Sequence, residues 1–379
     1  MATSELLAAP ILRALSDPED RLLARAILGT DDGDAIAARV DEHCRAVMGG
    51  AGVASVDLVE LSVGAAFGLT LADGRRVFLK AWSAATPAAL LRDAHAVQAF
   101  PAARGFPCPG VLAGPRPFGD GHAAIPQYRD DGDHADANDP SIRRAMAATL
   151  ARLVALAAPL RDDLPGLPRG RVPRAALWPV PHNALFDFGA TRHGAAWIDR
   201  IAAAGREVLL AAGGPAVVGH RDWSAHNMRF GRGGGVSAVY DWDSLKVEPE
   251  AVLVGAAAAA TFPATWYVEV RKYPPPEAAA AFVRDYEEAR GRRFGTAERA
   301  VVAAAATYGL AYTARCEHAL DPAAEPARDS ARRMLPAHAP DVLAVLLADP
   351  TKEVAHPPND GWRPSPPISA MIPDFRNGL

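Results

Sequence analysis

Cysteine is scarce in this sequence. The three cysteines, Cys44, Cys108 and Cys316, are odd in number and lie far apart along the chain. Their spacing fits neither a disulfide framework nor a metal site with closely spaced ligands. We therefore expect a reducing, cytoplasmic setting.

Long apolar runs and a targeting segment are also missing. The longest stretch of small apolar residues, 251–262, is well short of the ~20 residues that cross a bilayer. The first residues lack a basic region, and Glu5 and Arg13 interrupt their apolar run. We expect a soluble protein with no membrane partner.

Charge of one sign is not in excess. The chain has 40 Lys and Arg against 44 Asp and Glu, a formal net charge of -4 and a pI near 6.3. A broad cationic surface is excluded, so we expect no nucleic-acid partner. With 379 residues and 50% apolar side chains, the chain is long enough for two lobes with a cleft. Composition predicts nothing about the oligomeric state.

Lysine is rare among the basic residues, with only four in the chain. One of them, Lys80, closes the apolar strand-like run VFLK. Where arginine is so strongly preferred, a lysine at this place suggests that a compact ammonium group is needed. The alternative is a solubilising lysine on an edge strand.

The order of the expected elements is strands first and mostly helices afterwards, which indicates an α+β protein. Helical periodicity covers residues 4–48, with a break at Asp17-Pro18. Residues 53–82 read as strands, with a hairpin turn at Asp73-Gly74. Further along we expect a helix at 87–100, a turn-rich segment at 101–117, a short strand near 122–125, a polar linker at 129–140, helices at 141–157 and about 195–212, and strands at 216–220 and 236–241.

This order predicts three parts of the chain. They are an N-lobe at 1–126, made of a helical extension (about 1–48) and a sheet (about 49–126), a helical C-lobe at 127–350, and a Pro-rich tail at 351–379.

Residues 217–243 carry the strongest chemical signal. Asp222 and Asn227 lie five positions apart on one loop, and Asp241 ends the next strand. Phosphoryl transfer needs a group that positions a hydroxyl and metal ions that neutralise phosphate charge. Mg²⁺ prefers hard oxygen ligands, which these side chains supply.

The pattern His220-x-Asp222-x(4)-Asn227, followed by Asp241-Trp242-Asp243, resembles the aminoglycoside phosphotransferase family of small-molecule kinases. That resemblance implies a bilobal, protein-kinase-like fold with a small antiparallel-sheet N-lobe and a larger helical C-lobe. It also implies that Asp222 acts as catalytic base or orients the acceptor hydroxyl, that His220 braces the loop, and that Asn227 and Asp241 bind Mg²⁺. It covers roughly residues 53–320.

The same resemblance implies a nucleotide site, with ATP or GTP as the donor. Lys80 matches the lysine that contacts the donor phosphates. Ser62 and Gly64 stand in the phosphate-covering loop, although the motif G-x-G-x-x-G is absent. Phe78 lies two residues before the lysine on the same face. Gln127 and Tyr128 belong to the segment 125–128 that would meet the base.

Two positions depart from the family pattern. The acidic partner of the lysine is usually Glu, but no Glu occurs between Glu60 and Glu207, so Asp93 is the candidate. After the metal-binding Asp the family commonly shows P-x-x-D-L, and Val252 stands where its loop-anchoring Asp would be. Another group must then hold the catalytic loop.

The acceptor cannot be read from the sequence. We expect a nucleotide triphosphate and a small-molecule hydroxyl as partners, the hydroxyl belonging to an antibiotic of the aminoglycoside, nucleoside or macrolide-like kind. The alternatives are a kinase of choline, homoserine or a sugar, and a catalytically silent binding protein. Acidic candidates for a cationic acceptor are Asp187, Asp199, Asp243, Glu248, Asp285, Glu287, Glu288 and Glu317. Aromatic candidates for a flatter acceptor are Trp178, Phe186, Phe188, Trp197, Trp223, Trp242, Trp266 and Tyr267.

Overall fold

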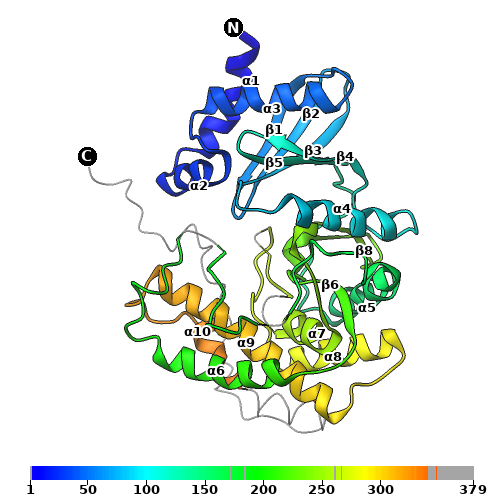
Figure 1. The fold of residues 1–379 in the computed structure, drawn as a ribbon, viewed down its shortest axis with the longest axis vertical. Helices are drawn as coiled ribbons and strands as arrows, with labels where there is room; N and C mark the ends of the chain where they lie inside the picture. Colours follow the sequence, from blue (N-terminus) through cyan, green and yellow to red (C-terminus); the bar gives the residue numbers. More distant parts are fainter. Residues whose placement is uncertain are drawn as a thin grey trace. The chain divides into compact units, whose positions relative to one another are not determined.

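The computed structural model describes residues 2–170, 172–182, 185–259, 262–265, 267–328, 330–339 and 347. The predicted Pro-rich tail at 351–379 and the candidate Trp266 lie outside these residues. The chain packs as two units (Figure 1). Unit 1 contains the residues up to Asp130, residues 159–168 and a short stretch beginning at His182, and unit 2 contains the other described residues.

Unit 1 is built around one five-stranded sheet with the strand order β1-β2-β3-β5-β4. Every neighbouring pair of strands is antiparallel. Its elements are α1 (Ala2–Ala14), α2 (Pro18–Leu28), α3 (Gly33–Val47), β1 (Val53–Leu61), β2 (Ala65–Leu71), β3 (Arg76–Trp82), α4 (Ala88–Ala102), β4 (Val111–Phe118) and β5 (Gly121–Pro126). The expected hairpin joins β2 to β3, and Gly74 adopts the positive φ (83°) that its turn requires.

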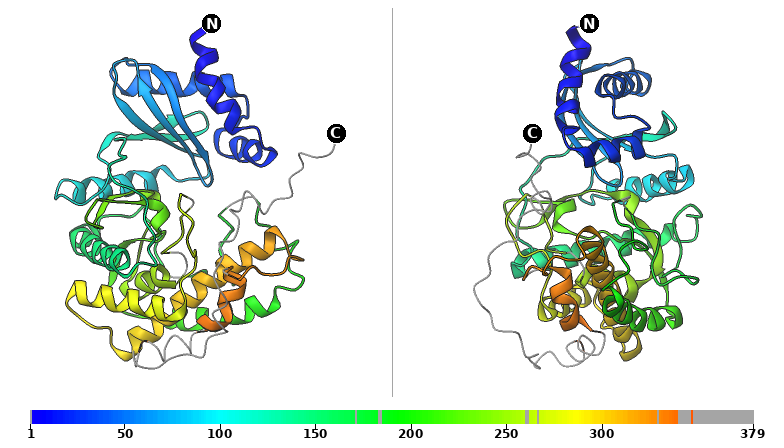
Figure 2. Two further views of the ribbon diagram at one scale, coloured as in Figure 1. Left: turned by 180° about the vertical axis from the view of Figure 1, so that it is seen from behind. Right: turned by 90° about the vertical axis from the view of Figure 1, so that its left-hand side faces the viewer.

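Helices cover both faces of the sheet of unit 1. The helical extension α1–α3 packs on one face, where Phe67, Leu69 and Leu79 join its apolar core (Figure 2). Helix α4 packs on the other face, where Leu91 meets Trp82. Because successive strand residues point to opposite faces, β3 presents Phe78, Lys80 and Trp82 on the α4 side, as the alternation predicts.

Strand β4 was not expected, because residues 101–117 read as a turn-rich segment. It contains Pro115 and Pro117 and lies at the edge of the sheet. Proline lacks the N–H that a central strand must donate, but an edge strand has a side that needs no donor. The prolines that argued against a strand are therefore compatible with this one.

Unit 2 is mostly helical and contains two small antiparallel ribbons, β6 with β9 and β7 with β8. Its elements are α5 (Pro140–Ala157), α6 (Ala196–Ala211), β6 (Ala216–His220), β7 (Met228–Phe230), β8 (Val236–Val239), β9 (Leu245–Pro249), α7 (Glu250–Ala259), α8 (Pro276–Arg290), α9 (Thr296–Leu320) and α10 (Ala331–Met334). Helices α7 and α9 approach so closely that a Cβ on Gly255 would lie 2.2 Å from the carbonyl oxygen of Val302. Glycine at position 255 therefore permits the close packing of α7 against α9.

The polar linker predicted at 129–140 is only partly a linker. Asp133 and Phe230 exchange both backbone hydrogen bonds at 2.8 Å, so the linker pairs with β7. Ser237 Oγ also donates to the Asp131 carbonyl at 2.6 Å. The linker therefore adds a short paired segment to the ribbon that follows the catalytic loop.

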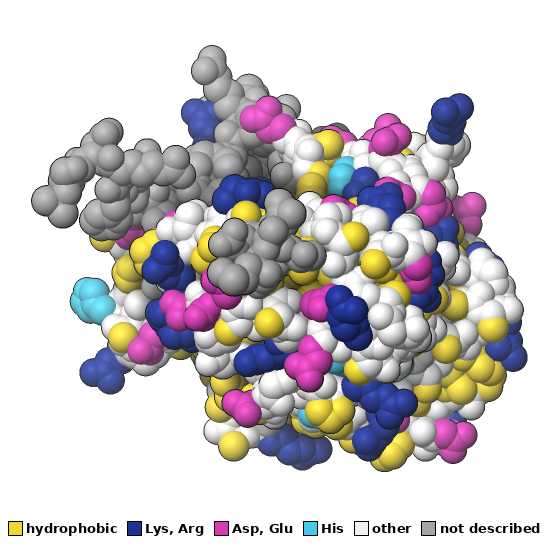
Figure 3. Space-filling view, turned by 90° about the horizontal axis from the view of Figure 1, so that it is seen from above, with side chains coloured by type: hydrophobic (Ala, Val, Ile, Leu, Met, Phe, Trp, Pro, Cys, Tyr) yellow, Lys and Arg dark blue, Asp and Glu magenta, His cyan; other side chains and the backbone are white. Residues whose placement is uncertain are grey.

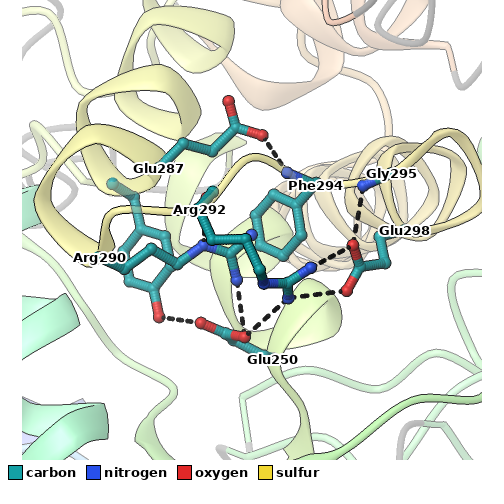
Figure 4. Close-up of polar contacts among 8 residues, drawn as sticks. Glu250, Glu287, Arg290, Arg292, Phe294, Gly295 and Glu298 are labelled. Atoms are coloured by element: carbon teal, nitrogen blue, oxygen red, sulfur yellow. Dashed lines mark hydrogen bonds and ion pairs between the residues drawn. The ribbon is translucent and has the colours of Figure 1, made fainter.

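A cluster of charged and aromatic side chains joins α7, α8 and the start of α9 (Figure 4). Glu250, the first residue of α7, accepts a hydrogen bond from Tyr286 Oη at 2.8 Å and lies 2.7 Å from Arg290. The Arg290 guanidinium also lies 3.7 Å from the centroid of the Phe294 ring. Glu250 therefore joins α7 to α8 where β9 leads into α7, and Arg292, 3.6 Å from Glu250 and 2.9 Å from Glu298, links this pair to α9.

Acidic and basic side chains are interspersed on the face that Figure 3 shows.

All three cysteines are buried free thiols. Burial raises the pKa of each thiol to about 12. Within the described part of the chain, no helix is both long and apolar enough to span a membrane.

Candidate active site

The loop between β1 and β2 lies against Lys80. Ser62 donates its N–H to the Gly64 carbonyl at 2.9 Å, which closes a tight turn. A Cβ on Gly64 would lie 2.8 Å from the Ala81 carbonyl oxygen and 3.7 Å from Lys80 Cε. Only glycine permits this close approach. The structure thus brings Ser62, Gly64 and Lys80 together within unit 1.

Lys80 lies among aromatic side chains on the α4 face of the sheet. Its Nζ is 5.7 Å from the centroid of the Trp82 ring. Trp82 meets His95 of α4 edge-on, with ring centroids 6.2 Å apart. Burial, reinforced by the charge of Lys80, lowers the pKa of His95 to about 4, so His95 is neutral beside the ammonium at neutral pH.

Phe78 and Tyr128 lie together, but Gln127 is already engaged. The rings of Phe78 and Tyr128 are tilted with centroids 6.5 Å apart, and Tyr128 packs against Gly68. Gln127 donates its backbone N–H to the Gly110 carbonyl at 2.7 Å. While this bond is made, the Gln127 N–H cannot meet a nucleobase.

Asp93, the candidate partner of Lys80, makes another contact. Its carboxylate accepts a hydrogen bond from the Gly166 N–H at 2.6 Å. Aspartate has a shorter arm than the glutamate that usually serves here, and this contact holds it toward the segment 159–168. The pairing with Lys80 stays a prediction that has to compete with this contact.

In unit 2 the turn between β6 and β7 brings Asp222 and Asn227 into contact. Asn227 Nδ2 donates to Asp222 Oδ2 at 2.8 Å and to the Asp222 carbonyl at 3.1 Å. These bonds fix the orientation of the Asp222 carboxylate and leave Asn227 Oδ1 as the acceptor end of the amide. Asn227 is buried, so this arrangement is well held.

Asp241 reaches the same turn from the end of β8. The Tyr240 N–H donates to the Asn227 carbonyl at 2.9 Å, and His220 Nε2 contacts the Tyr240 carbonyl at 2.8 Å. Asp241 has φ 64° and is the one non-glycine residue with positive φ in the described ranges. Such backbone strain persists only where surrounding contacts hold it, and it is frequent at functional sites. One contact is the Ser244 hydroxyl, which donates to Asp241 Oδ2 at 2.9 Å.

The oxygen atoms of this turn suit a divalent cation that takes further ligands from elsewhere. The described residues contain no group of three or more His, Cys, Asp or Glu side chains able to hold a metal. An amide oxygen and a carboxylate on adjoining backbone segments match Mg²⁺, which commonly uses one or two protein ligands plus phosphates and water. Asn227 and Asp241 fit that pattern.

Most acidic candidates for binding a cationic acceptor are used in structural contacts. Asp285 pairs with Arg143 at 2.7 Å, Glu248 with Arg221 at 3.0 Å, and Asp199 accepts from Trp178 Nε1 at 2.9 Å. Glu287 accepts from the Phe294 N–H at 2.6 Å, and Glu317 accepts from the N–H groups of Ala331 and Arg332 at 2.9 Å. These carboxylates are not available as a ready acidic lining.

Sequence reasoning named Tyr267 as an aromatic candidate but missed the two histidines that stack on it beside the turn of residues 221–227. The Tyr267 ring stacks on His134 at 3.8 Å and on His226 at 5.2 Å, with interplanar angles of 12° and 7°. Tyr267 is 46% exposed, and His226 directly precedes Asn227. The His226 N–H donates to the Ala264 carbonyl at 2.8 Å, which ties the two segments together. No local signal connects these residues, since they come from three distant segments.

The connection between α5 and α6 (residues 169–181 and 185–195) is held by side chains from α6 and α9. Arg206 donates to the Pro173 and Arg174 carbonyls, Tyr308 to Leu177, and Arg315 to Phe188, while His318 Nε2 contacts the His193 carbonyl, at distances of 2.5–3.1 Å. Trp178, Phe188 and Tyr312 form an aromatic cluster there. The described residues of this connection are therefore held in a defined path, although none of them belongs to a helix or strand.

One cavity of about 470 Å³ lies within unit 2 beside this connection. It is lined by the connection, by the C-terminal end of α6 and by β6 and β9, with Arg169, Arg174 and Glu248 among the charged residues. One of the strands that line it, β6, leads into the turn that contains Asp222 and Asn227.

Comparisons with known proteins identify the family and the fold. The profile of the phosphotransferase enzyme family (APH) matches residues 60–301. The structure is similar to that of the amicoumacin kinase hAmiN in complex with AMP-PNP, Ca²⁺ and Ami, at 12% identity and a TM-score of 0.55, over 84% of this chain and 96% of that one. It is also similar to spectinomycin phosphotransferase APH(9)-Ia in complex with ADP and spectinomycin, at 9% identity and a TM-score of 0.52, over 80% and 98%. No curated protein matches the sequence.

The two structural similarities confirm the expected α+β, protein-kinase-like fold. The family match covers well over half of the chain, and it includes Lys80 and the whole catalytic turn. The chain belongs to the phosphotransferase enzyme family and is a small-molecule phosphotransferase that acts on a hydroxyl group.

Proposed function

We propose that this enzyme transfers the γ-phosphoryl group of ATP or GTP to a hydroxyl group of an antibiotic, with Mg²⁺ as the metal. The observation that carries the proposal is the convergence of Asp222, Asn227 and Asp241 on one turn of unit 2. Hydrogen bonds of 2.8 and 2.9 Å link the three segments. The proposal places the enzyme in the cytoplasm, in keeping with its free thiols.

In this mechanism Asp222 accepts the proton of the acceptor hydroxyl as its oxygen bonds to the γ-phosphorus. The bond from that phosphorus to the β–γ bridging oxygen breaks, and the nucleoside diphosphate leaves with that electron pair. Asn227 keeps the Asp222 carboxylate oriented through the 2.8 Å hydrogen bond. His220 holds the turn through the Tyr240 carbonyl.

Asn227 Oδ1 and the Asp241 carboxylate would hold Mg²⁺, which when bound neutralises the negative charge of the donor phosphates. Within unit 1, Lys80 would bind donor phosphates, with Ser62 and Gly64 covering them. Phe78 and Tyr128 would face the base. Engagement of the Gln127 N–H by Gly110 limits the donors that this segment offers. We also propose that the N-lobe ends at residue 126 and that the C-lobe begins at residue 127.

Two observations favour an acceptor of low positive charge. The carboxylates that would attract a polycation are largely engaged in ion pairs and caps, as described above. Tyr267 is instead 46% exposed although His134 and His226 stack on its ring, so it presents an aromatic side chain to solvent beside the turn of residues 221–227. Among antibiotics, nucleoside or macrolide-like compounds therefore fit better than highly charged aminoglycosides. The structural neighbours named for amicoumacin and spectinomycin support antibiotic acceptors by analogy of fold alone.

Mass spectrometry tests the proposal directly. The protein is incubated with Mg²⁺, with ATP or GTP, and with a panel of nucleoside, macrolide and aminoglycoside antibiotics and with choline and homoserine. We expect one added phosphoryl group on an antibiotic. Phosphorylation of choline or homoserine alone would replace the antibiotic acceptor by a primary metabolite.

Asp222→Asn is the matched control, because it keeps the size of the side chain and one oxygen that can accept from Asn227 Nδ2, but removes the charge and the basicity. Loss of a general base lowers the rate by ~10²–10⁴-fold. Turnover by Asp222→Asn near the wild-type rate would contradict the assigned role. Tight nucleotide binding with no phosphorylated product from any compound would indicate a catalytically silent protein instead.

A further inference from the structure

The residue that precedes the proposed base makes a buried ion pair. Arg221 Nη1 donates to both carboxylate oxygens of Glu248, at 3.0 and 3.2 Å. The Glu248 side chain is 0% exposed and that of Arg221 is 24% exposed. A carboxylate removed from water to this extent depends on its partner, because an unpaired charge is costly in such surroundings.

Strand pairing explains why these two residues meet. Strands β6 and β9 are antiparallel, with Val217 opposite Glu248 and Gly219 opposite Lys246. The Arg221 N–H continues the ladder by donating to the Ser244 carbonyl at 3.0 Å. Arg221, Lys246 and Glu248 therefore share one face of the ribbon, since alternate strand residues point the same way.

This face holds more positive than negative charge. Burial lowers the pKa of Lys246, Arg221 lowers it further, and Glu248 opposes both effects. Glu248 therefore pairs with Arg221 and partly offsets the effect of that cation on Lys246. Without it, Arg221 and Lys246 would repel each other at the base of the catalytic turn.

The neighbouring helix does not supply an anchor. Val252 of α7 is apolar and only 1% exposed, so it offers no charged contact to the loop. Leu253 of α7 packs on the ribbon so closely that a Cβ on Gly219 would lie 2.1 Å from its Cδ2. The charged contact to the loop therefore comes from β9, and the helix contributes apolar packing.

We propose that Glu248 is a positioning residue, which fixes the proposed base Asp222 by holding Arg221, the residue next to it in the chain. Lys246 sets how strongly the site depends on this carboxylate. The inference rests on the proposed role of Asp222. It assigns to Glu248 the anchoring that the apolar Val252 cannot provide.

The test compares Glu248→Gln with wild type in steady-state kinetics, using the acceptor found in the panel, or nucleotide hydrolysis by water if none is found. We expect kcat to fall by ~10–100-fold, because a base displaced by about 1 Å loses rate on that order. KM for the nucleotide should change less than about twofold, since the carboxylate of Glu248 bonds to Arg221, which has no proposed role in binding the nucleotide. Hydrogen–deuterium exchange of the peptide spanning 221–227 should become faster.

Two double variants separate positioning from general stability. Glu248→Gln with Arg221→Gln should be no slower than the slower single variant, because the two residues act as one unit. Glu248→Gln with Lys246→Met should recover part of the rate, because it removes one of the two unbalanced cations. This second double variant should also unfold less readily than Glu248→Gln alone, so it tests the positioning role if the single variant fails to fold.

Asp222→Asn, assayed in parallel, distinguishes the two ways of failing. If Asp222→Asn keeps the wild-type rate, the proposed function fails and this inference fails with it. If Asp222→Asn is inactive while Glu248→Gln stays within twofold of wild type in kcat, only the positioning role is overturned. Additive losses in the double variant with Arg221→Gln would overturn it as well.

Discussion

Neutralising Glu250 should destabilise unit 2 far more than a typical loss of one surface charge. Glu250→Gln keeps an oxygen that can accept from Tyr286 but removes the charge opposite Arg290. The two side chains are 14% and 9% exposed, and their charged atoms lie 2.7 Å apart. Breaking one partner of such a buried pair costs about 3–5 kcal/mol.

The expected loss lies near the lower end of that range. Arg292, the second cation near Glu250, is 53% exposed and keeps its 2.9 Å contacts with Glu298, so it needs no replacement. We therefore expect Glu250→Gln to lower the free energy of unfolding by about 3 kcal/mol. With a urea dependence of ~2–3 kcal/mol/M, the midpoint should fall by about 1 M.

Urea unfolding followed by circular dichroism and tryptophan fluorescence measures this shift. Because the chain has two units, the transition of unit 2 should move and that of unit 1 should not. Glu298→Gln is the matched control. Its partner is largely exposed, so the change should cost under about 1 kcal/mol. A midpoint for Glu250→Gln no lower than that of Glu298→Gln would refute the reasoning.

Three other changes have expected outcomes. Gly255→Ala places a Cβ against a backbone carbonyl of α9 and should lower the thermal midpoint, with a net loss of about 1–3 kcal/mol, whereas Gly213→Ala, with open space around it, should be nearly neutral. Burial lowers the pKa of His338 to about 4 in the folded protein, whereas the histidine of the unfolded chain has a pKa near 6.5. Between these pH values the unfolded chain binds a proton that the folded chain does not bind, so the free energy of unfolding should fall as pH drops from about 6.5 to about 4. In His338→Asn, the difference between the free energies of unfolding at the two pH values should be smaller than in wild type by up to about 3 kcal/mol. Gly64→Val should push the β1–β2 loop off β3 and raise KM for the nucleotide by roughly tenfold, and an unchanged KM would separate that loop from the nucleotide.

Local chemistry made the larger part of the fold predictable. The Asp73-Gly74 turn and the helix start at Asp17-Pro18 each depend on two adjacent residues. Both occur as expected, with α2 beginning at Pro18. Elements whose formation depends on distant partners were missed. Strand β4 is stabilised by its place at the sheet edge, and the linker around Asp133 by backbone pairing with β7.

The candidate site divides in the same way. Asp222, Asn227 and Asp241 lie within twenty residues of one another, so their spacing alone indicates shared chemistry. Arg221 and Glu248 are 27 positions apart, and only the register of β6 and β9 shows that they meet. The contact of Asp93 with Gly166 could not be predicted either, because it depends on a segment that returns from much later in the chain.

The way the α5–α6 connection is tethered has a consequence for how such an enzyme diversifies. Its tethers from Arg206, Tyr308 and His318 end on main-chain carbonyl oxygens, which every amino acid possesses. Replacing residues along the connection therefore leaves these attachments intact, whereas replacing the tethers on α6 and α9 releases it. Substitutions of outward side chains in this connection should therefore cost little stability, whereas the tethering residues of α6 and α9 should tolerate few substitutions.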